Sequence, residues 1–215
     1  FAGASPVSYD HIEGLTLDLD ANDFLVLGTN GEDTIKVVGS EDPQVTDAYM
    51  ISVNASAAIS VTNAGELTID GLHGDDEIDI DVFYLDLDAL TVIGNNPSAE
   101  GDTLTVEGVL QGADNAQWSP TSVDGGSLVV GAQTITVETM ERLVYEGMAE
   151  DESLTVNGTG AANTIVHTPG AAVDAGQVQV DSLLAIHYLN LGAGGSVTLH
   201  GQGGADTVVA RGTAG

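Results

Sequence analysis

The sequence has no cysteine and only three basic residues, which are Lys36, Arg142 and Arg211. Without cysteine it can form no disulfide scaffold, zinc–thiolate site or cysteine nucleophile. Three cations are too few to neutralise nucleic-acid phosphates or to hold the chain on an anionic membrane surface. Against them stand 33 Asp and Glu residues, which give a formal net charge of −30. We therefore expect no nucleic-acid partner and no membrane insertion, and consider a polysaccharide or a basic protein as a partner.

Aromatic residues are also scarce, at 4% of the 215 residues, and no apolar run approaches the roughly 18 residues of a membrane span. Such a composition suits thin layers of small aliphatic side chains better than an ordinary globular core. The density of Val, Ile, Leu and Thr argues against an acidic disordered chain. The length predicts a single domain over residues 1–215. Because the sequence starts at Phe1 rather than Met, we interpret it as a processed or excised piece of a longer precursor.

Most periodic segments alternate apolar and polar residues with a period of two, which is the pattern of a half-buried β-strand. Residues 77–82 are the longest example, and the alternation predicts that Ile78 and Ile80 point inward while Glu77, Asp79 and Asp81 share the outer face. Clusters of Gly, Asn, Asp and Pro separate these segments. Residues 137–145 could pass for a short helix, but their β-branched content argues against it. The sequence predicts an all-β fold.

A turn motif, Gly-x-x-Gly-x-Asp-x-aliphatic, recurs between the predicted strands. Its three good copies begin at Gly28, Gly71 and Gly201, and their acidic positions are Asp33, Asp76 and Asp206. Asp33 and Asp76 are 43 positions apart, and so are Asn163 and Asp206. This spacing suggests three divergent repeats, at approximately 25–100, 100–157 and 158–215.

Repeated strands and glycine-rich turns without helices favour a parallel β-helix or β-solenoid, expected to be right-handed. Tandem β-sandwich modules are the alternative, because short strands with frequent turns also describe that fold. The solenoid is preferred because the turn motif recurs in the same context, between two strands.

Residues 201–209, Gly-Gln-Gly-Gly-Ala-Asp-Thr-Val-Val, resemble the nonapeptide of haemolysin-type (RTX) calcium-binding repeats. In that family, tandem glycine turns form a parallel β-roll that holds Ca²⁺ between its coils. More broadly, residues 67–80 and 154–165 look like divergent repeats of very large secreted or cell-surface bacterial proteins. The resemblance implies an extracellular or cell-surface location. This sequence departs from the RTX pattern because its good copies are isolated rather than tandem.

The resemblance also supplies candidate Ca²⁺ ligands. The acidic positions of the motif and the carboxylates near the second copy form this set, which is Asp33, Asp75, Asp76, Asp79, Asp81 and Asp206. In the alternative interpretation, each motif Asp caps its turn by accepting a hydrogen bond from its own backbone.

The sequence favours a structural or interaction protein over an enzyme. Thirty-three acids make pairs of carboxylates inevitable, and the five histidines have no catalytic context. Because a solenoid end carries unpaired strand edges, we expect head-to-tail stacking between chains in a filament or with neighbouring repeats of a longer chain. The alternatives are a Ca²⁺-binding secreted module and a carbohydrate-binding or carbohydrate-cleaving β-helix. Trp118 lies in a stretch that breaks the alternation, which predicts a loop packed over a face or a partner contact.

Overall fold

The computed structural model describes residues 14–39, 48–83, 85, 87–96, 101–109 and 112–212. In these residues the chain forms 19 β-strands and no helix, which confirms the predicted all-β class. No helix in this part of the chain is therefore long and apolar enough to cross a membrane. Residues 137–145 end one strand and begin the next, as their β-branched content predicts.

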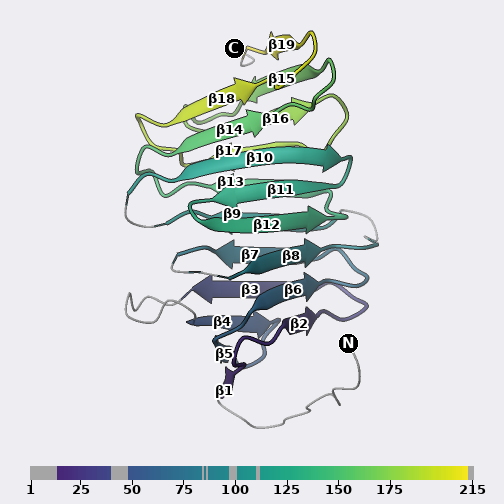
Figure 1. The fold of residues 1–215 in the computed structure, drawn as a ribbon, viewed down its shortest axis with the longest axis vertical. Helices are drawn as coiled ribbons and strands as arrows, with labels where there is room; N and C mark the ends of the chain where they lie inside the picture. Colours follow the sequence, from purple (N-terminus) through teal and green to yellow (C-terminus); the bar gives the residue numbers. More distant parts are fainter. Residues whose placement is uncertain are drawn as a thin grey trace.

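The strands form two mixed sheets (Figure 1). The eleven-stranded sheet has, in spatial order, β1 (Leu15–Asp18), β5 (Ile59–Thr62), β4 (Ala48–Val53), β3 (Thr34–Gly39), β7 (Glu77–Asp81), β9 (Thr103–Glu107), β13 (Arg142–Glu146), β17 (Ile186–Leu189), β16 (Gly176–Val180), β15 (Thr164–Pro169) and β19 (Thr207–Ala210). The eight-stranded sheet has β18 (Ser196–His200), β14 (Ser153–Asn157), β10 (Asn115–Ser122), β11 (Gly125–Val130), β12 (Gln133–Glu138), β8 (Ala89–Ile93), β6 (Glu66–Asp70) and β2 (Phe24–Leu27).

The chain crosses repeatedly from one sheet to the other, so strands of successive crossings pair in parallel, as β7 does with β9 and β9 with β13. Three antiparallel meanders interrupt this pattern. They are β3–β4–β5, β10–β11–β12 and β15–β16–β17. Each meander folds back within one sheet and lies between two strands that it pairs with in parallel.

The strand pairing of β1–β7 recurs in β13–β19. The pairs β1·β5, β2·β6 and β3·β7 have the counterparts β13·β17, β14·β18 and β15·β19, with the same parallel direction. Thr34 pairs with Glu77, and Thr164 pairs with Thr207, so corresponding residues lie 130 positions apart. The pairing therefore recurs over a longer interval than the three predicted repeats, whose boundaries stay a prediction.

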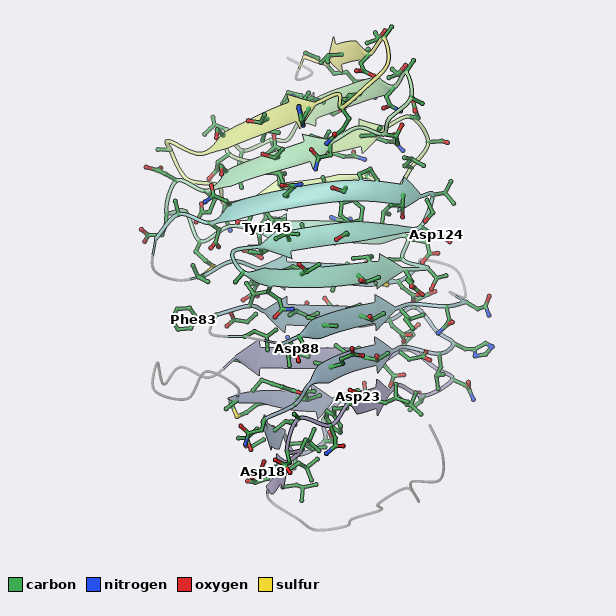
Figure 2. The ribbon with its side chains drawn as sticks, in the orientation of Figure 1. Asp18, Asp23, Phe83, Asp88, Asp124 and Tyr145 are labelled. Atoms are coloured by element: carbon green, nitrogen blue, oxygen red, sulfur yellow. The ribbon has the colours of Figure 1, made fainter. Side chains whose placement is uncertain are left out.

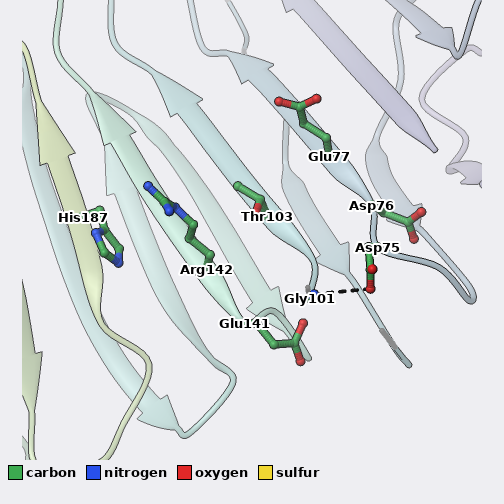
Figure 3. A pocket seen from close by; sticks show the side chains of 8 residues that line it. All are labelled: Asp75, Asp76, Glu77, Gly101, Thr103, Glu141, Arg142 and His187. Carbon is green, nitrogen blue, oxygen red and sulfur yellow. Dashed lines mark hydrogen bonds between the residues drawn. The ribbon is translucent and has the colours of Figure 1, made fainter. Parts of the chain in front are cut away.

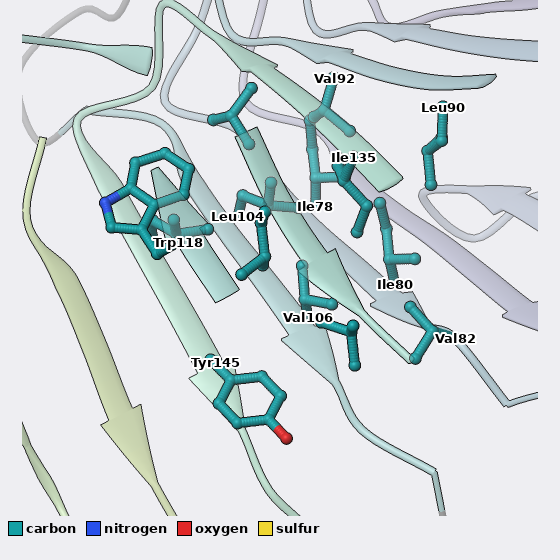
Figure 4. Close-up of a cluster of buried hydrophobic side chains, with 14 of the residues drawn as sticks. Ile78, Ile80, Val82, Leu90, Val92, Leu104, Val106, Trp118, Ile135 and Tyr145 are labelled. Carbon is teal, nitrogen blue, oxygen red and sulfur yellow. The ribbon is translucent and has the colours of Figure 1, made fainter. Parts of the chain in front are cut away.

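The core lies between the sheets and is made of the inward residues of both (Figure 4). Ile78 and Ile80 are fully buried, whereas Glu77 is exposed and Asp79 and Asp81 are half-buried on the opposite face. The predicted alternation over β7 is thus confirmed. Exposed acids such as Asp18, Asp23 and Asp88 lie along the outside of the molecule (Figure 2).

Trp118 corrects one prediction. It lies in β10, is fully buried, and its indole Nε1–H donates to the Leu184 carbonyl at 3.2 Å. It is therefore neither a surface loop nor an exposed partner contact. With Tyr145 it supplies bulk to a core that is mostly aliphatic (Figure 4).

Candidate functional site: a ladder of carboxylates

An acid or amide stands directly before a strand at each of six crossings from the eight-stranded to the eleven-stranded sheet. These residues are Asp33, Asp76, Asp102, Glu141, Asn163 and Asp206, before β3, β7, β9, β13, β15 and β19. Parallel pairing of these strands brings the residues before them into line along one side of the molecule.

Hydrogen bonds join neighbouring members of this line. The N–H of Asp33 donates to Asp76 Oδ1 at 2.9 Å, and the N–H of Asp76 donates to Asp102 Oδ1 at 2.8 Å. The N–H of Asp102 donates in turn to Glu141 Oε2 at 2.8 Å. We call these four residues the carboxylate ladder. A shorter copy follows later in the chain, where the N–H of Asn163 donates to Asp206 Oδ1 at 2.9 Å.

The first glycine of the turn motif makes room for the carboxylate that ends it. A Cβ on Gly71 would overlap Asp76 Oδ2, and a Cβ on Gly201 would overlap Asp206 Oδ2. At Gly28 a Cβ would lie 2.5 Å from the Gly71 carbonyl oxygen. The five-residue spacing from glycine to acid thus reflects a close approach of the side chain to the backbone of its own turn.

The second oxygens of the ladder differ in their partners. Asp33 Oδ2 accepts from the Thr29 N–H at 2.6 Å, as the turn-capping interpretation predicts. Asp76 Oδ2 and Asp102 Oδ2 are buried and have no hydrogen-bond donor. A buried carboxylate oxygen without a donor is costly in its ionised form. The ionised forms of Asp76 and Asp102, at the centre of the ladder, are therefore energetically unfavourable.

The pKa values of the ladder follow from this burial. Burial raises the pKa of Asp76 to about 6, and the charges of Asp102, Asp33 and Asp75 add to the rise, while the bond from the Asp33 N–H opposes it. Burial likewise raises the pKa of the Asp102 and Glu141 carboxyls. Protonation of this line, which relieves its charge, therefore begins at a pH above the usual range of a carboxyl group.

The turn after the middle strand of two meanders adds an acid–amide pair to the line. Asn54, at the end of β4, donates through Nδ2 to Asp33 Oδ1 at 2.6 Å and accepts the Thr34 N–H through Oδ1 at 2.9 Å. At the corresponding place after β16, Asp181 accepts from Asn163 Nδ2 at 2.7 Å and from the Thr164 N–H at 2.7 Å. The acid and the amide have exchanged places between the two copies. Each copy thus keeps one carboxylate and avoids two in contact.

The backbone at these two positions explains the residue types. Asn54 has a φ of 55° and Asp181 a φ of 51°, in the left-handed region that Asn and Asp tolerate better than other side chains. The bonds from Thr164 and Asn163 lower the pKa of Asp181. Asn54 and Asp181 were not predicted as site residues, although Asn or Asp at a strand end was a signal for such a turn.

Crossings in the opposite direction carry a similar device. Asp114 precedes β10 and accepts the Val109 N–H at 2.6 Å, and Glu152 precedes β14 and accepts the Met148 N–H at 2.9 Å. Both acids are buried. Buried acids before strands thus accept backbone N–H groups at crossings in both directions.

A hollow of about 510 Å³ opens beside the ladder (Figure 3). Its lining residues are Asp75, Asp76, Glu77, Gly101, Thr103, Glu141, Arg142 and His187. Burial, together with the Arg142 charge, lowers the pKa of His187, so the imidazole is neutral at neutral pH. The hollow thus combines four acids with one guanidinium, and its charge disfavours an anionic ligand.

The predicted Ca²⁺ ligands lie either just before strands β3, β7 and β19 or on the outer face of β7. The carboxylates of Asp33, Asp76 and Asp206 accept the backbone N–H groups of Thr29, Asp33 and Asn163. Asp75 accepts the Gly101 N–H at 3.3 Å (Figure 3). Asp79 pairs with Lys36, whose Nζ lies 2.8 Å from Asp79 Oδ2, and Asp81 accepts the Phe83 N–H. Among the described residues, no three His, Cys, Asp or Glu side chains are grouped to hold a metal ion. A Ca²⁺ role for these residues stays a prediction.

The outer face of the eleven-stranded sheet carries a row of three acids on neighbouring strands, formed by Asp81, Glu107 and Glu146. Burial raises the pKa of Glu107, and the charges of Asp81 and Glu146 add to the rise. Glu146 Oε1 accepts from Asn190 Nδ2 at 2.7 Å. Charge along this row is therefore only partly compensated.

No protein-family model, curated protein or solved structure matches this chain.

Proposed function

We propose that this chain is a structural and interaction protein, an acidic β-solenoid segment of an extracellular surface, matrix or filament assembly. Its role is to supply length and stiffness, and it stacks head to tail with another copy or with neighbouring repeats of a longer chain. In this proposal it catalyses no reaction.

The observation that carries the proposal is the recurrence of pairing between β1–β7 and β13–β19, with parallel pairs throughout the crossings. Stacked repeats bury their apolar faces against their neighbours, so such a recurrence supports a solenoid over separate sandwich modules. The carboxylate ladder supports the same conclusion, because each of its hydrogen bonds joins the residue before one strand to the residue before the neighbouring strand.

The charge distribution supports an extracellular setting. Acids occupy the outer face while aliphatics fill the core, and the net charge of −30 leaves the surface strongly anionic. Such a surface keeps an assembly soluble and repels copies of itself sideways. Contacts at the ends of the stack are therefore favoured over lateral contacts.

Sedimentation velocity combined with negative-stain microscopy tests the proposal over a range of NaCl and CaCl₂ concentrations. We expect rods whose length grows with protein concentration, and longer rods at higher ionic strength because salt screens the surface charge. Stable single particles under every condition would refute self-assembly by this chain. A matched sample at low protein concentration shows whether the rods form reversibly.

A Ca²⁺-binding module is the second candidate, and the row of Asp81, Glu107 and Glu146 favours it. Burial raises the Glu107 pKa and the neighbouring charges add to the rise, and a divalent cation would relieve that mutual repulsion. Thermal unfolding with EDTA and with millimolar Ca²⁺ provides the test. A bound ion at a hundredfold excess over its Kd stabilises the fold by about 2.7 kcal/mol. Equal melting temperatures with EDTA, Ca²⁺ and matched NaCl would exclude this candidate, and Glu107→Gln is the control for the row.

A further inference from the structure

The end of the molecule formed by β18 and β19 is open. Each is the last strand of its sheet, and in the described chain each pairs with a neighbour on one side (Figure 1). The inward side chain of β19, Val208, is 57% exposed, whereas its counterpart Ile78 in β7 is fully buried. Asp206 is exposed, whereas its counterpart Asp76 is buried. This end therefore lacks a layer that the interior has.

The interior shows what that layer is. β6 and β7, the counterparts of β18 and β19, are covered by the parallel strands β8 and β9. Leu104 of β9 lies opposite Ile78, and Asp102 accepts the N–H of Asp76 at 2.8 Å. The N–H of Asp206 has no acceptor among the described residues. Three features of this end are therefore explained by one absent pair of strands. They are the open edges of β18 and β19, the exposed Val208 side chain and the Asp206 N–H without an acceptor.

We propose that the β18–β19 end is an interface for a strand–turn–strand segment of the β8–β9 type. Its two strands add in parallel to the open edges, an aliphatic side chain covers Val208, and an acid before its second strand accepts the Asp206 N–H. This inference rests on the proposed function and names which neighbouring repeat the assembly requires at this end.

The first strands of a second copy fit this place less well. β1 and β2 correspond to β13 and β14, whose interior neighbours are β9 and β10 in addition to β17 and β18. Seating β1 on β19 would therefore create a pair corresponding to β7 and β13, which the interior does not contain. The strand order thus favours a β8–β9 segment as the occupant.

The test mixes the full chain with a labelled peptide of residues 85–108, in 0.5 M NaCl to screen the acids of both. We expect saturable binding and slower hydrogen exchange in β19. Val208→Asp should weaken binding at least tenfold, whereas Val209→Asp, on the outward neighbour, should change it less than twofold. In the peptide, Asp102→Ala should weaken binding about tenfold, while Asp102→Asn, which keeps an acceptor oxygen, should restore most of it.

A tethered version removes the cost of bringing two separate molecules together. The chain is extended after Arg211 by a copy of residues 82–138, so that β8–β12 follow β19 as they follow β7. Val208→Asp should then lower the melting temperature of the extended chain by several degrees more than that of the original chain. An extension of scrambled sequence is the control.

Unchanged hydrogen exchange in β19 with both the peptide and the extension would overturn the inference. Self-association of the original chain that Val208→Asp abolishes, without peptide binding, would assign the end to a second copy; the inference would then fail while the proposed function stands. Absence of both binding and assembly would reject both.

Discussion

The N–H of Asp33 donates to Oδ1 of Asp76 at 2.9 Å, while Oδ2 of Asp76 stays buried without a donor. One carboxylate thus has a structural oxygen that binds the neighbouring crossing and a second oxygen that carries an unrelieved electrostatic cost. The two can be separated by substitution, because an amide keeps the acceptor and removes the charge.

Asp76→Asn should change the pH dependence of stability. The Asp76 pKa is about 6 in the folded protein against an ordinary value of 3.8, so the unfolded chain releases this proton first as pH rises. The wild type therefore loses stability between about pH 4 and pH 6, by about 3 kcal/mol, and stays at the lower level above it. Asp76→Asn should lack this loss. Urea unfolding at closely spaced pH values measures the difference.

The control for that prediction is Asp76→Ala. It removes the acceptor as well as the charge, so the Asp33 N–H is left unpaired in a buried site. We expect Asp76→Ala to be less stable than Asp76→Asn by about 1–3 kcal/mol at every pH. Parallel stability curves for the wild type and Asp76→Asn from pH 4 to pH 8 would show that Asp76 carries no buried charge.

Gly28→Ala and Gly31→Ala separate the two glycines of one turn motif. A Cβ at Gly28 would lie 2.5 Å from the Gly71 carbonyl, which is backbone and cannot move aside, whereas a Cβ at Gly31 meets just Thr29 Oγ1 at 3.9 Å. We expect Gly28→Ala to cost about 1–3 kcal/mol and Gly31→Ala to stay within about 0.5 kcal/mol of the wild type. Chemical denaturation compares them, and equal effects would contradict the packing role of the first glycine.

The facing of the strands could be predicted from the sequence because a period of two assigns alternate residues to opposite sides of a sheet, as in β7. The partners of each strand could not, since alternation looks the same in a parallel and an antiparallel pair. The fold-back of β4 on β3 is therefore absent from the predictions. Motif spacing identified Asp33 and Asp76. It could not show that the backbone N–H of Asp33 donates a hydrogen bond to the Asp76 carboxylate.

Trp118 shows a signal that was present and misinterpreted. Ala116, Trp118 and Pro120 are buried and alternate with polar residues, so β10 follows the strand pattern after all. Trp118 and Pro120 are residue types that made this stretch resemble a loop. Pro120 is accommodated where the register with β11 shifts, between Pro120 and Ser122.

Trp118→Phe should destabilise the protein by about 1–3 kcal/mol, because it removes both packing volume and the Nε1–H bond to the Leu184 carbonyl. Since Trp118 is the sole tryptophan, its emission in the folded protein should be blue-shifted and should move to longer wavelength on unfolding. Val123→Ala, at an exposed position, is the stability control. Emission typical of solvent-exposed indole in the native protein would contradict this burial.

Exchange of the acid and the amide between Asp33 and Asn54 should be tolerated, because Asn163 and Asp181 already have the exchanged arrangement. Asn54→Asp alone places a second carboxylate where Asn54 Nδ2 now lies 2.6 Å from Asp33 Oδ1, and we expect a loss of about 1–3 kcal/mol at pH 8. Asp33→Asn added to it should recover most of that loss, since one carboxylate and one amide again face each other.

A double-mutant cycle from urea unfolding measures the coupling between positions 33 and 54. Repetition in 1 M NaCl should reduce the destabilisation caused by Asn54→Asp where solvent reaches the pair. The reciprocal exchange at Asn163 and Asp181 is the matched control and should give coupling of the same sign. Strictly additive effects would show that the opposite arrangement in the two copies is without energetic consequence.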